Sequence, residues 1–247
     1  MTFVHPTTSS TFYSAMLSNF LNILVILHPL FHIASGSLSS KPDATACPEF
    51  RESLQAVKLV FHDAAIPGDL KIDFEPQALL NIAWPPPDPE TEPVYTYPGR
   101  HLLDNVTFAT PTFTATGLHD DNQGPFVIIM LAPDVPASEK PSLREFIGSD
   151  FYVTHRRGKG GSVLVNQTVA VAQWRRPHPP RTSPEQRYVF LMYDQPPTFN
   201  STLNLDNTTF RNFDVVDYAV RNGLGDPIAG TFMYIESNAS CWRDGCT

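Results

Sequence analysis

The sequence predicts a mainly β fold: two antiparallel sheets packed as a sandwich, with a few short peripheral helices. Pro occupies 24 of the 247 positions, about twice its usual share of ~5%, which argues against long helices and favours short strands joined by ordered loops. Two continuous apolar runs, FVIIML at 126–131 and YVFLMY at 188–193, have the length of buried strands. The chain is long enough to bury a sizeable core, and we expect a single domain over residues 48–247.

The first half of this domain contains one predicted helix and one extended segment. Apolar residues recur at helical spacing over 48–64, and Pro67-Gly68 ends the helix. Residues 73–84 favour an extended conformation. Residues 85–98 are too rich in Pro for either regular element, so we expect a loop there.

The second half is predicted to be strands with one helix near the end. Residues 151–154 and 163–165 flank a Gly-rich turn and indicate a hairpin. A short helix is expected over 213–222, because Gly223 supplies a stop signal after its apolar face. The last strand is expected over 228–235.

The N-terminal segment differs from the rest of the chain in charge. Residues 1–40 contain no Asp, Glu, Lys or Arg, and 20–27 are densely apolar. Small residues at 34–36 have the spacing of a signal-peptidase site, so we interpret 1–36 as a secretory signal peptide. The usual basic start is missing, and Met16 is an alternative initiation site that would leave a more compact leader. An uncleaved anchor and a buried helix are the other interpretations of this segment.

Sequons and cysteines agree with export. Residues 37–47 are predicted to form a flexible lead-in to the domain. Five Asn-x-Ser/Thr sites follow it, and glycans on them would supply solubility that charge does not. These glycosylation candidates are Asn105, Asn166, Asn200, Asn207 and Asn238.

Cys47, Cys241 and Cys246 lie at the two ends of the predicted mature chain. This placement favours a disulfide between the termini over a metal site, which would need a second pair of ligands. Closing a loop of roughly 200 residues would stabilise the fold by up to about 5 kcal/mol in the chain-entropy model. We expect Cys47 to pair with Cys241 in preference to Cys246. Three free thiols are the alternative.

Composition excludes several classes of function. The net charge is −8, from 25 acidic and 17 basic residues, whereas proteins that bind nucleic acid usually carry a basic excess. There is no G-x-S-x-G nucleophile motif and no zinc-finger spacing. The apolar part of the leader is shorter than the ~20 residues of a membrane span. We therefore expect a non-enzymatic protein without a metal or other cofactor, without a nucleic-acid partner and without a stable membrane span.

Three loop segments stand out at the ends of predicted strands: 132–136, 144–153 and 177–196. Each combines charged or aromatic residues with rigid turns, and Pro is frequent in the first and third. Loops of this kind at the ends of buried strands can form a preformed pocket, or they can be well-ordered turns and nothing more.

At these segments the chain resembles the phosphatidylethanolamine-binding protein family, in its fungal branch. The family carries an Asp-Pro-Asp-x-Pro loop, a Pro-Pro pair and a Gly-x-His-Arg-Tyr entry into a strand, and six similar motifs occur here in the family's order over roughly 48–236. The matching positions are Phe74-Glu75-Pro76, Thr110-Pro111, Pro133-Asp134-x-Pro136, Pro179-Pro180, Arg187-Tyr188 with Tyr193-Asp194-Gln195-Pro196, and Asp226-Pro227.

The resemblance implies two antiparallel sheets, a small anion pocket for a phospholipid head group, and no catalysis. Some members of the family inhibit serine carboxypeptidases. Carried over position by position, the resemblance gives a set of ligand-binding candidates. These are Ala132, Asp134, Pro136, Phe146, Asp150, Pro179, Pro180, Gln186 and Tyr188.

Three of these candidates depart from the family's pattern. Ala132 replaces the first loop Asp, Gln186 replaces a pocket His, and Asp150 is expected to replace a second pocket His. Loss of cationic donors weakens phosphate binding, so we expect a neutral or cationic ligand. The predicted function is that of a secreted small-molecule or lipid-binding protein. The alternatives are an extracellular inhibitor of a serine carboxypeptidase and a surface glycoprotein with a vestigial pocket.

Overall fold

The structure is a computed structural model. It describes residues 54–237 apart from 87, 89, 120, 135–142, 158–160, 182 and 201–212. The predicted leader, the lead-in, the three cysteines, Pro136 and the sequons at Asn207 and Asn238 lie outside the described residues. Export and the disulfide therefore stay predictions.

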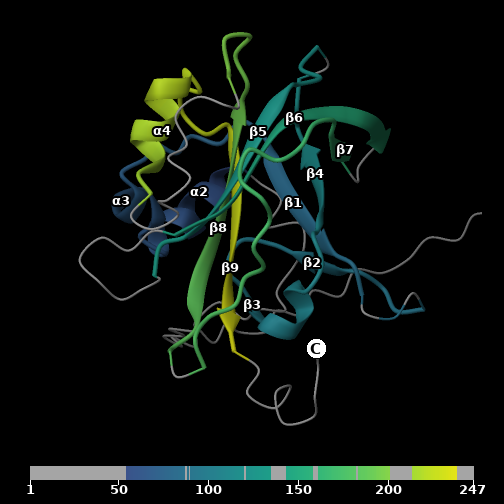
Figure 1. Cartoon of the computed structure of the whole chain (residues 1–247), viewed down its shortest axis with the longest axis vertical. Coiled ribbons are helices and arrows are strands. Elements are labelled where there is room, and N and C mark those ends of the chain that lie inside the picture. Colours follow the sequence, from purple (N-terminus) through teal and green to yellow (C-terminus); the bar gives the residue numbers. More distant parts are fainter. Residues whose placement is uncertain are drawn as a thin grey trace, which may run out of the picture. The chain divides into compact units, whose positions relative to one another are not determined.

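Figure 1 shows strands running through the centre of the domain, with helices gathered on one side. The helices are α2 (Leu54–Asp63), α3 (Ile66–Leu70), the 3-10 turn η1 (Asp104–Thr107) and α4 (Val215–Asn222). The strands are β1 (Leu79–Trp84), β2 (Val94–Thr96), β3 (Arg100–Leu103), β4 (Thr112–Thr116), β5 (Phe126–Ala132), β6 (Leu143–Arg157), β7 (Gly161–Asn166), β8 (Gln186–Asp194) and β9 (Ala229–Glu236).

The prediction of a mainly β fold with a few short helices is confirmed, but the strands do not form two separate sheets. All nine form one hydrogen-bonded sheet in the order β2-β1-β4-β7-β6-β5-β8-β9-β3. The reason is β6, which pairs with β5 over its first part and with β7 over its last part. Its register with β7 shifts between Val153 and His155, and such irregularities let a strand bend. The nearly closed sheet is therefore continuous where two sheets were expected.

The central strands are buried on both faces, which explains their uninterrupted apolar sequences. Along β5, Ile128 and Met130 belong to a core cluster enclosed by the sheet, here called the inner core. Ile129 and Leu131 alternate with them and belong to a second cluster beneath the helices, the outer core. Burial on both faces removes apolar side chains from water, and this stabilises the fold by about 25 cal/mol per Å² of apolar surface buried.

The helices cover the outer face of β5, β8 and β9. Phe61 of α2 is fully buried, stacks on Phe74 with centroids 4.2 Å apart and meets Phe232 of β9 edge-on at 5.2 Å. In α4 the Asp214 side chain caps the first turn, and Gly223 ends the helix with φ 68°, a conformation that glycine adopts without steric cost. The predicted helix stop at Gly223 is confirmed.

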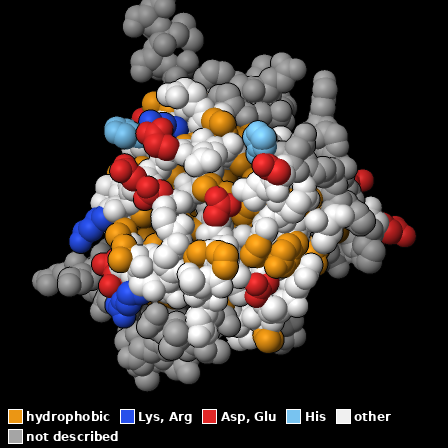
Figure 2. All heavy atoms as spheres, turned by 90° about the horizontal axis from the view of Figure 1, so that it is seen from above, with side chains coloured by type: hydrophobic (Ala, Val, Ile, Leu, Met, Phe, Trp, Pro, Cys, Tyr) orange, Lys and Arg blue, Asp and Glu red, His pale blue; other side chains and the backbone are white. Residues whose placement is uncertain are grey.

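The basic side chains visible on the face that Figure 2 shows do not gather into one patch. They lie apart from one another among acidic and apolar side chains. Across the part of the chain that the structure describes, no helix is both long and apolar enough to cross a membrane.

Candidate functional site

The candidate site lies where β8 begins, on the face that the sheet encloses. Side chains alternate along a strand, so Gln186 and Tyr188 point to the inner core while Arg187 between them points to the helices. Ala132 and Phe146 belong to the same inner cluster as Tyr188. The structure therefore brings these four predicted residues together.

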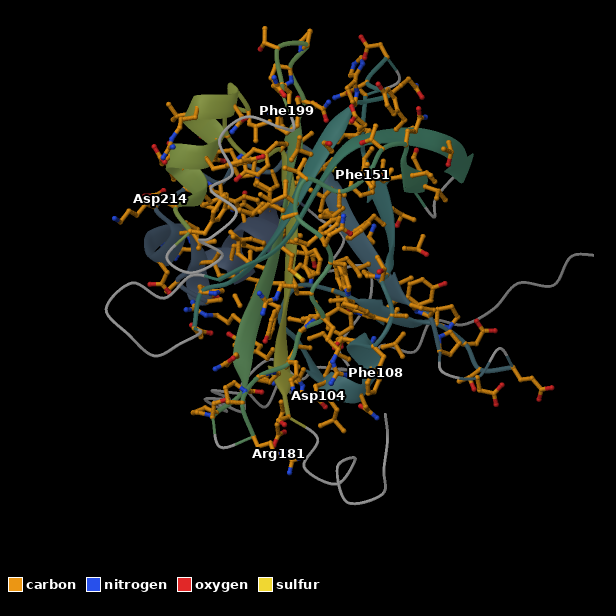
Figure 3. The ribbon with its side chains drawn as sticks, in the orientation of Figure 1. Asp104, Phe108, Phe151, Arg181, Phe199 and Asp214 are labelled. Atoms are coloured by element: carbon orange, nitrogen blue, oxygen red, sulfur yellow. The ribbon has the colours of Figure 1, made fainter. Side chains whose placement is uncertain are left out.

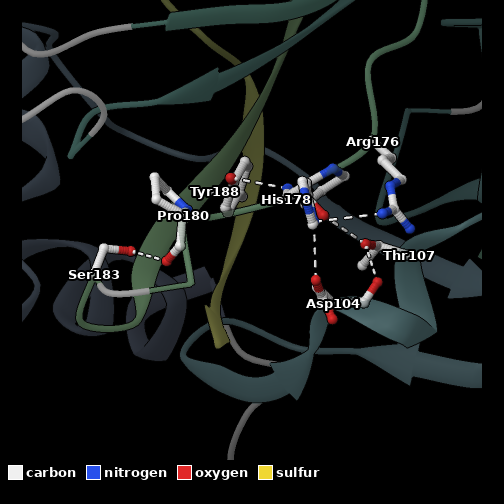
Figure 4. A network of polar contacts seen from close by, with 8 residues as sticks. Asp104, Thr107, Arg176, His178, Pro180, Ser183 and Tyr188 are labelled. Carbon is white, nitrogen blue, oxygen red and sulfur yellow. Dashed lines mark hydrogen bonds and ion pairs between the residues drawn. The ribbon is translucent and has the colours of Figure 1, made fainter. Parts of the chain in front are cut away.

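A loop ahead of β8 closes this site and is fixed by polar contacts (Figure 4). The backbone N–H of His178 donates to the Tyr188 hydroxyl at 3.1 Å, and His178 Nδ1 lies 2.9 Å from Asp104 Oδ2. The Thr107 hydroxyl lies 2.9 Å from the carbonyl oxygens of both Asp104 and Pro177. Because these contacts cross from η1 to the loop, they hold Pro179, which is buried, against the start of β8. The adjacent Pro180 is exposed.

Arg176 places a cation on the outer side of this loop. Its guanidinium carbon lies 4.1 Å from the centre of the Phe108 ring, and its Nη2 lies 3.4 Å from His178 Nδ1. Its Nη1 is buried without a hydrogen-bond partner among the described residues. The cation therefore lies within reach of Asp104 and His178, beside the site and not at its centre.

Asp134 was predicted to bind a ligand, but its carboxylate is hydrogen-bonded to Arg187. The carboxylate accepts the Arg187 backbone N–H at 2.8 Å and its Nε–H at 3.0 Å, and Arg187 Nη2 also lies 2.7 Å from Asp69 Oδ2. Nη1 donates to the Ala64 carbonyl at 2.5 Å. The hydrogen bonds that Arg187 donates to the Asp134 carboxylate are the main cause that raises the pKa of Arg187 above its ordinary value. Asp134 thus ties the end of β5 to β8 and to the helices.

Asp150 is the clear error among the predicted pocket residues. Its neighbour Phe151 pairs with Phe126 at the start of β5, and Phe126 pairs with Asp194 at the end of β8. Gln186 is at the opposite end of β8, nine residues long, and at about 3.3 Å per residue the two ends are far apart. Figure 3 shows Phe151 near one end of the strands and Asp104 near the other. Asp150 therefore does not line the site with Gln186.

The contacts of Asp150 explain why it is present. Its Oδ1 accepts from Gln195 Nε2 at 2.7 Å, its Oδ2 accepts from the Thr168 hydroxyl at 2.8 Å, and its backbone N–H donates to Gln195 Oε1 at 2.7 Å. Its φ is 53°, a left-handed conformation that Asp tolerates better than most residues. Asp150 fastens the far end of the sheet.

The site that remains contains uncharged polar groups among aromatic rings. Gln186 is 7% exposed, and its Oε1 is buried without a partner in the described part of the chain. Trp174, from the loop ahead of β8, packs against Phe146 at 5.4 Å and against Phe190 at 6.3 Å, and its Nε1 is likewise unpartnered. Buried polar atoms without partners are uncommon. One acceptor and one donor are therefore available on this face.

Sequence reasoning missed Asp104, Trp174 and Arg176 as parts of this region. Asp104 is separated from His178 by 74 positions, so no local pattern joins them. The unusual feature in hindsight is that Asp104 is 3% exposed, since a buried carboxylate needs a partner. Within the described ranges, no group of three or more His, Cys, Asp or Glu side chains is arranged to hold a metal ion.

Comparison with known proteins places this geometry in a family. The family model described as phosphatidylethanolamine-binding protein matches residues 89–233. The chain belongs to the phosphatidylethanolamine-binding protein family. It is similar to CEN-like protein 1 of Nicotiana tabacum, with 26% identity over 180 residues, 73% of this chain and 93% of the relative.

Two solved structures share the fold of this family member. One is a carboxypeptidase Y inhibitor complexed with its cognate proteinase, with TM-score 0.61 and 21% identity over 76% of this chain and 98% of that one. The other is a phosphatidylethanolamine-binding protein from Plasmodium vivax, with TM-score 0.51 and 12% identity over 74% of this chain and 97% of that one. The resemblance inferred from sequence motifs is confirmed at the level of the family and its fold.

Proposed function

We propose that this chain is a secreted, non-enzymatic binding protein that takes a small molecule or part of a lipid at the start of β8. The observation that carries the proposal is Gln186, whose buried Oε1 lacks a partner in the described part of the chain. A buried unpaired acceptor costs about 1–3 kcal/mol, and a ligand that donates a hydrogen bond would remove this cost. Membership of a family named for binding a phospholipid supports the ligand class.

The charges around the site favour a neutral or cationic ligand group over a phosphate. Arg187 is occupied by Asp134 and Asp69, and Arg176 lies beside the Asp104–His178 pair. A phosphate needs several free donors, best if they are charged. The described residues at the centre of the site offer one neutral donor, Trp174 Nε1, next to the Gln186 acceptor, and the unpartnered Arg176 Nη1 lies beside the site. Asp150 does not affect this preference, because it lies at the other end of β8.

Calorimetry on the glycosylated chain tests this proposal directly. We expect phosphoethanolamine to bind weakly, and native mass spectrometry of the secreted protein to show a co-purifying ligand with no phosphate. Gln186→His should raise phosphoethanolamine affinity at pH 5.5, where imidazole is charged, and lose that gain at pH 8. Asp150→His is the matched control and should give no gain. Tight phosphate binding by the unmodified chain, abolished by Arg176→Gln, would refute the charge argument.

The secreted part of the proposal has its own test, because it rests on the leader and the sequons. Expression in a eukaryotic host should give a mature N-terminus near Ser37 and a mass that falls on endoglycosidase treatment. Non-reducing peptide mapping should find Cys47 joined to Cys241 or Cys246. Full-length unglycosylated chain in the cytosol would contradict export without bearing on the pocket.

A second candidate is an extracellular inhibitor of a serine carboxypeptidase. What favours it is the fold shared with the carboxypeptidase Y inhibitor, which was solved bound to its proteinase. An inhibitor should titrate such an enzyme one to one. A stoichiometric loss of peptidase activity would support this candidate, and unchanged activity at a tenfold excess would remove it.

A further inference from the structure

A separate pocket opens on the helix-covered side of the sheet, away from the candidate site. It measures about 270 Å³ and lies between α4, the segment after α3 and the loop that enters β9. Its lining comes from Lys71, Asp73, Tyr193, Val216, Ala219 and Asp226, among others. Tyr193 lies near the end of β8 and belongs to the outer core, so this pocket and Gln186 are at opposite ends and on opposite faces of one strand.

The Tyr193 hydroxyl is the polar group of this pocket that calls for a partner. Tyr193 is 1% exposed, and its hydroxyl makes no hydrogen bond to any described residue. Burial, reinforced by the nearby carboxylate of Asp226, raises the pKa of this phenol well above its ordinary value. The hydroxyl therefore stays protonated and neutral, able both to donate and to accept.

The walls of the pocket are fixed by backbone hydrogen bonds, so its shape does not depend on a ligand. The Leu224 N–H donates to the Ala219 carbonyl at 2.9 Å, and the Ile228 N–H donates to the Met192 carbonyl at 2.8 Å. On the opposite wall the Ile72 N–H donates to the Pro67 carbonyl at 3.1 Å. A preformed site of this kind loses little entropy when it binds a ligand.

Charge and shape together define what fits. The charged groups of the lining are the ammonium of Lys71 and the carboxylates of Asp73 and Asp226, so the pocket carries a net negative charge. Val216 and Ala219 supply apolar walls. The volume is slightly below the ~300–1,000 Å³ typical of sites for drug-sized ligands. An ammonium group satisfies both features at once, because it pairs with a carboxylate and donates to a phenol oxygen.

We propose that this pocket binds a small protonated amine with an apolar body, its nitrogen between Asp226 and the Tyr193 hydroxyl. The body lies against Val216 and Ala219. The site is independent of the one at Gln186 and of the function proposed for it.

Three probes with one carbon skeleton test this assignment: 2-phenylethylamine, 2-phenylethanol and phenylacetate. Backbone amide shifts in an NMR titration should move around Gly223 and Asp226, with affinity falling in the order amine, alcohol, acid. Tyr193→Phe should lower the affinity for the amine about fivefold, which corresponds to the loss of one ordinary hydrogen bond. Asp226→Asn, at an exposed carboxylate, should weaken amine binding about threefold and leave alcohol binding unchanged.

Controls separate binding from folding and from the other site. Tyr193→Phe should unfold at the same temperature as the parent or a higher one, because it removes an unpaired buried hydroxyl. Tyr95→Phe, at an exposed tyrosine of β2, and Gln186→His should leave amine binding unchanged. Val216→Phe fills the pocket and should abolish binding in a folded chain.

Three outcomes would overturn the proposal. The first is that no probe changes the amide chemical shifts around Gly223 and Asp226, as expected if only water binds the Tyr193 hydroxyl. The second is that the acid binds as well as the amine. The third is that both Tyr193→Phe and Asp226→Asn bind the amine like the parent.

Discussion

The two ends of β8 use carboxylates in different ways. At the first end Asp134 binds the charged guanidinium of Arg187, and at the second end Asp150 binds the uncharged amide of Gln195 and a hydroxyl. Both carboxylates fasten strands, although both were expected to face a ligand. Gln186 at the first end and Tyr193 near the second are neutral side chains, and each has a buried atom without a partner among the described residues. The two carboxylates thus serve the structure, whereas these two neutral groups carry the binding sites proposed above.

The largest loss of stability should come from removing the ion pair between Arg187 and Asp134 at the first end. Arg187→Ala removes the partner of the half-buried Asp134 together with its contacts to Asp69 and Ala64. An ion pair broken by loss of one partner costs several kcal/mol when buried, and we expect the free energy of unfolding to fall by about 3 kcal/mol in urea titrations. The control is Arg221→Ala, whose pair with Asp217 is about half exposed, and which should cost under ~0.5 kcal/mol. Equal effects would contradict the structural role of Arg187.

A substitution at the second end should lower the free energy of unfolding by less. Asp150→Ala removes the acceptors of Gln195 Nε2 and the Thr168 hydroxyl. It also leaves φ 53° to a residue without the short polar side chain that makes this left-handed conformation tolerable. We expect a loss of about 2 kcal/mol in the same titration. Ligand binding at Gln186 should be unchanged, and a change would show that the two ends communicate.

Replacing each carboxylate by its neutral amide, Asp134→Asn and Asp150→Asn, compares the contribution of charge to stability at the two ends. Asp134→Asn removes one negative partner of the Arg187 guanidinium and can place an amide NH2 against the N–H groups of Arg187. Asp150→Asn keeps one acceptor for the neutral partners of residue 150, and Asn tolerates a positive φ. We expect Asp134→Asn to cost about 1 kcal/mol more than Asp150→Asn. Salt should reduce the gap, because only the first pair is ionic. Identical unfolding midpoints for the two variants would count against this distinction.

The smallest expected difference concerns glycan occupancy at the two ends. Asn105, in η1 at the first end, is exposed. Asn166, at the second end, donates Nδ2–H to the Ser149 carbonyl at 2.6 Å, whereas the Thr of both sequons is hydrogen-bonded. A glycan on Nδ2 would disturb the bond to Ser149, so we expect full occupancy at Asn105 and low occupancy at Asn166. Glycopeptide mass spectrometry of secreted protein measures both, and full occupancy at Asn166 would be contrary evidence.

The parts of the fold that could be predicted are those with strong local signals. The apolar runs of β5 and β8 and the stop at Gly223 appear in the structure as expected, because burial on both faces and a left-handed cap each leave a local pattern. Strands β2, β3 and β4 were missed. They are short, and β3 is defined by its parallel pairing with β9, which no local pattern shows.

The site was predicted only where its register is simple. Family motifs mark the strands that carry Ala132, Phe146, Gln186 and Tyr188, and the structure brings these residues to one region, while their role in binding stays a prediction. Asp150 was misplaced because the strand was expected to begin at Phe151, whereas β6 begins at Leu143. Residue 150 therefore lies in the middle of β6, next to Phe151, which pairs with Phe126 at the far end of the sheet. Tyr193 was noted only as the start of the Tyr193-Asp194-Gln195-Pro196 motif and as an apolar strand position, and neither pattern indicates that its hydroxyl lacks a partner.

The parallel pairing of β3 with β9 has a consequence for the order in which the chain can fold during synthesis. Arg100 pairs with Met233, and Phe61 of α2 needs Phe232. At about 5–20 residues per second, the ribosome takes on the order of ten seconds to deliver β9 after β3. Throughout that interval the β3 edge and the apolar face of α2 lack their partners. The nascent chain therefore exposes these surfaces until its last strand emerges, and a ribosome stalled before residue 229 would hold a chain that cannot complete this sheet.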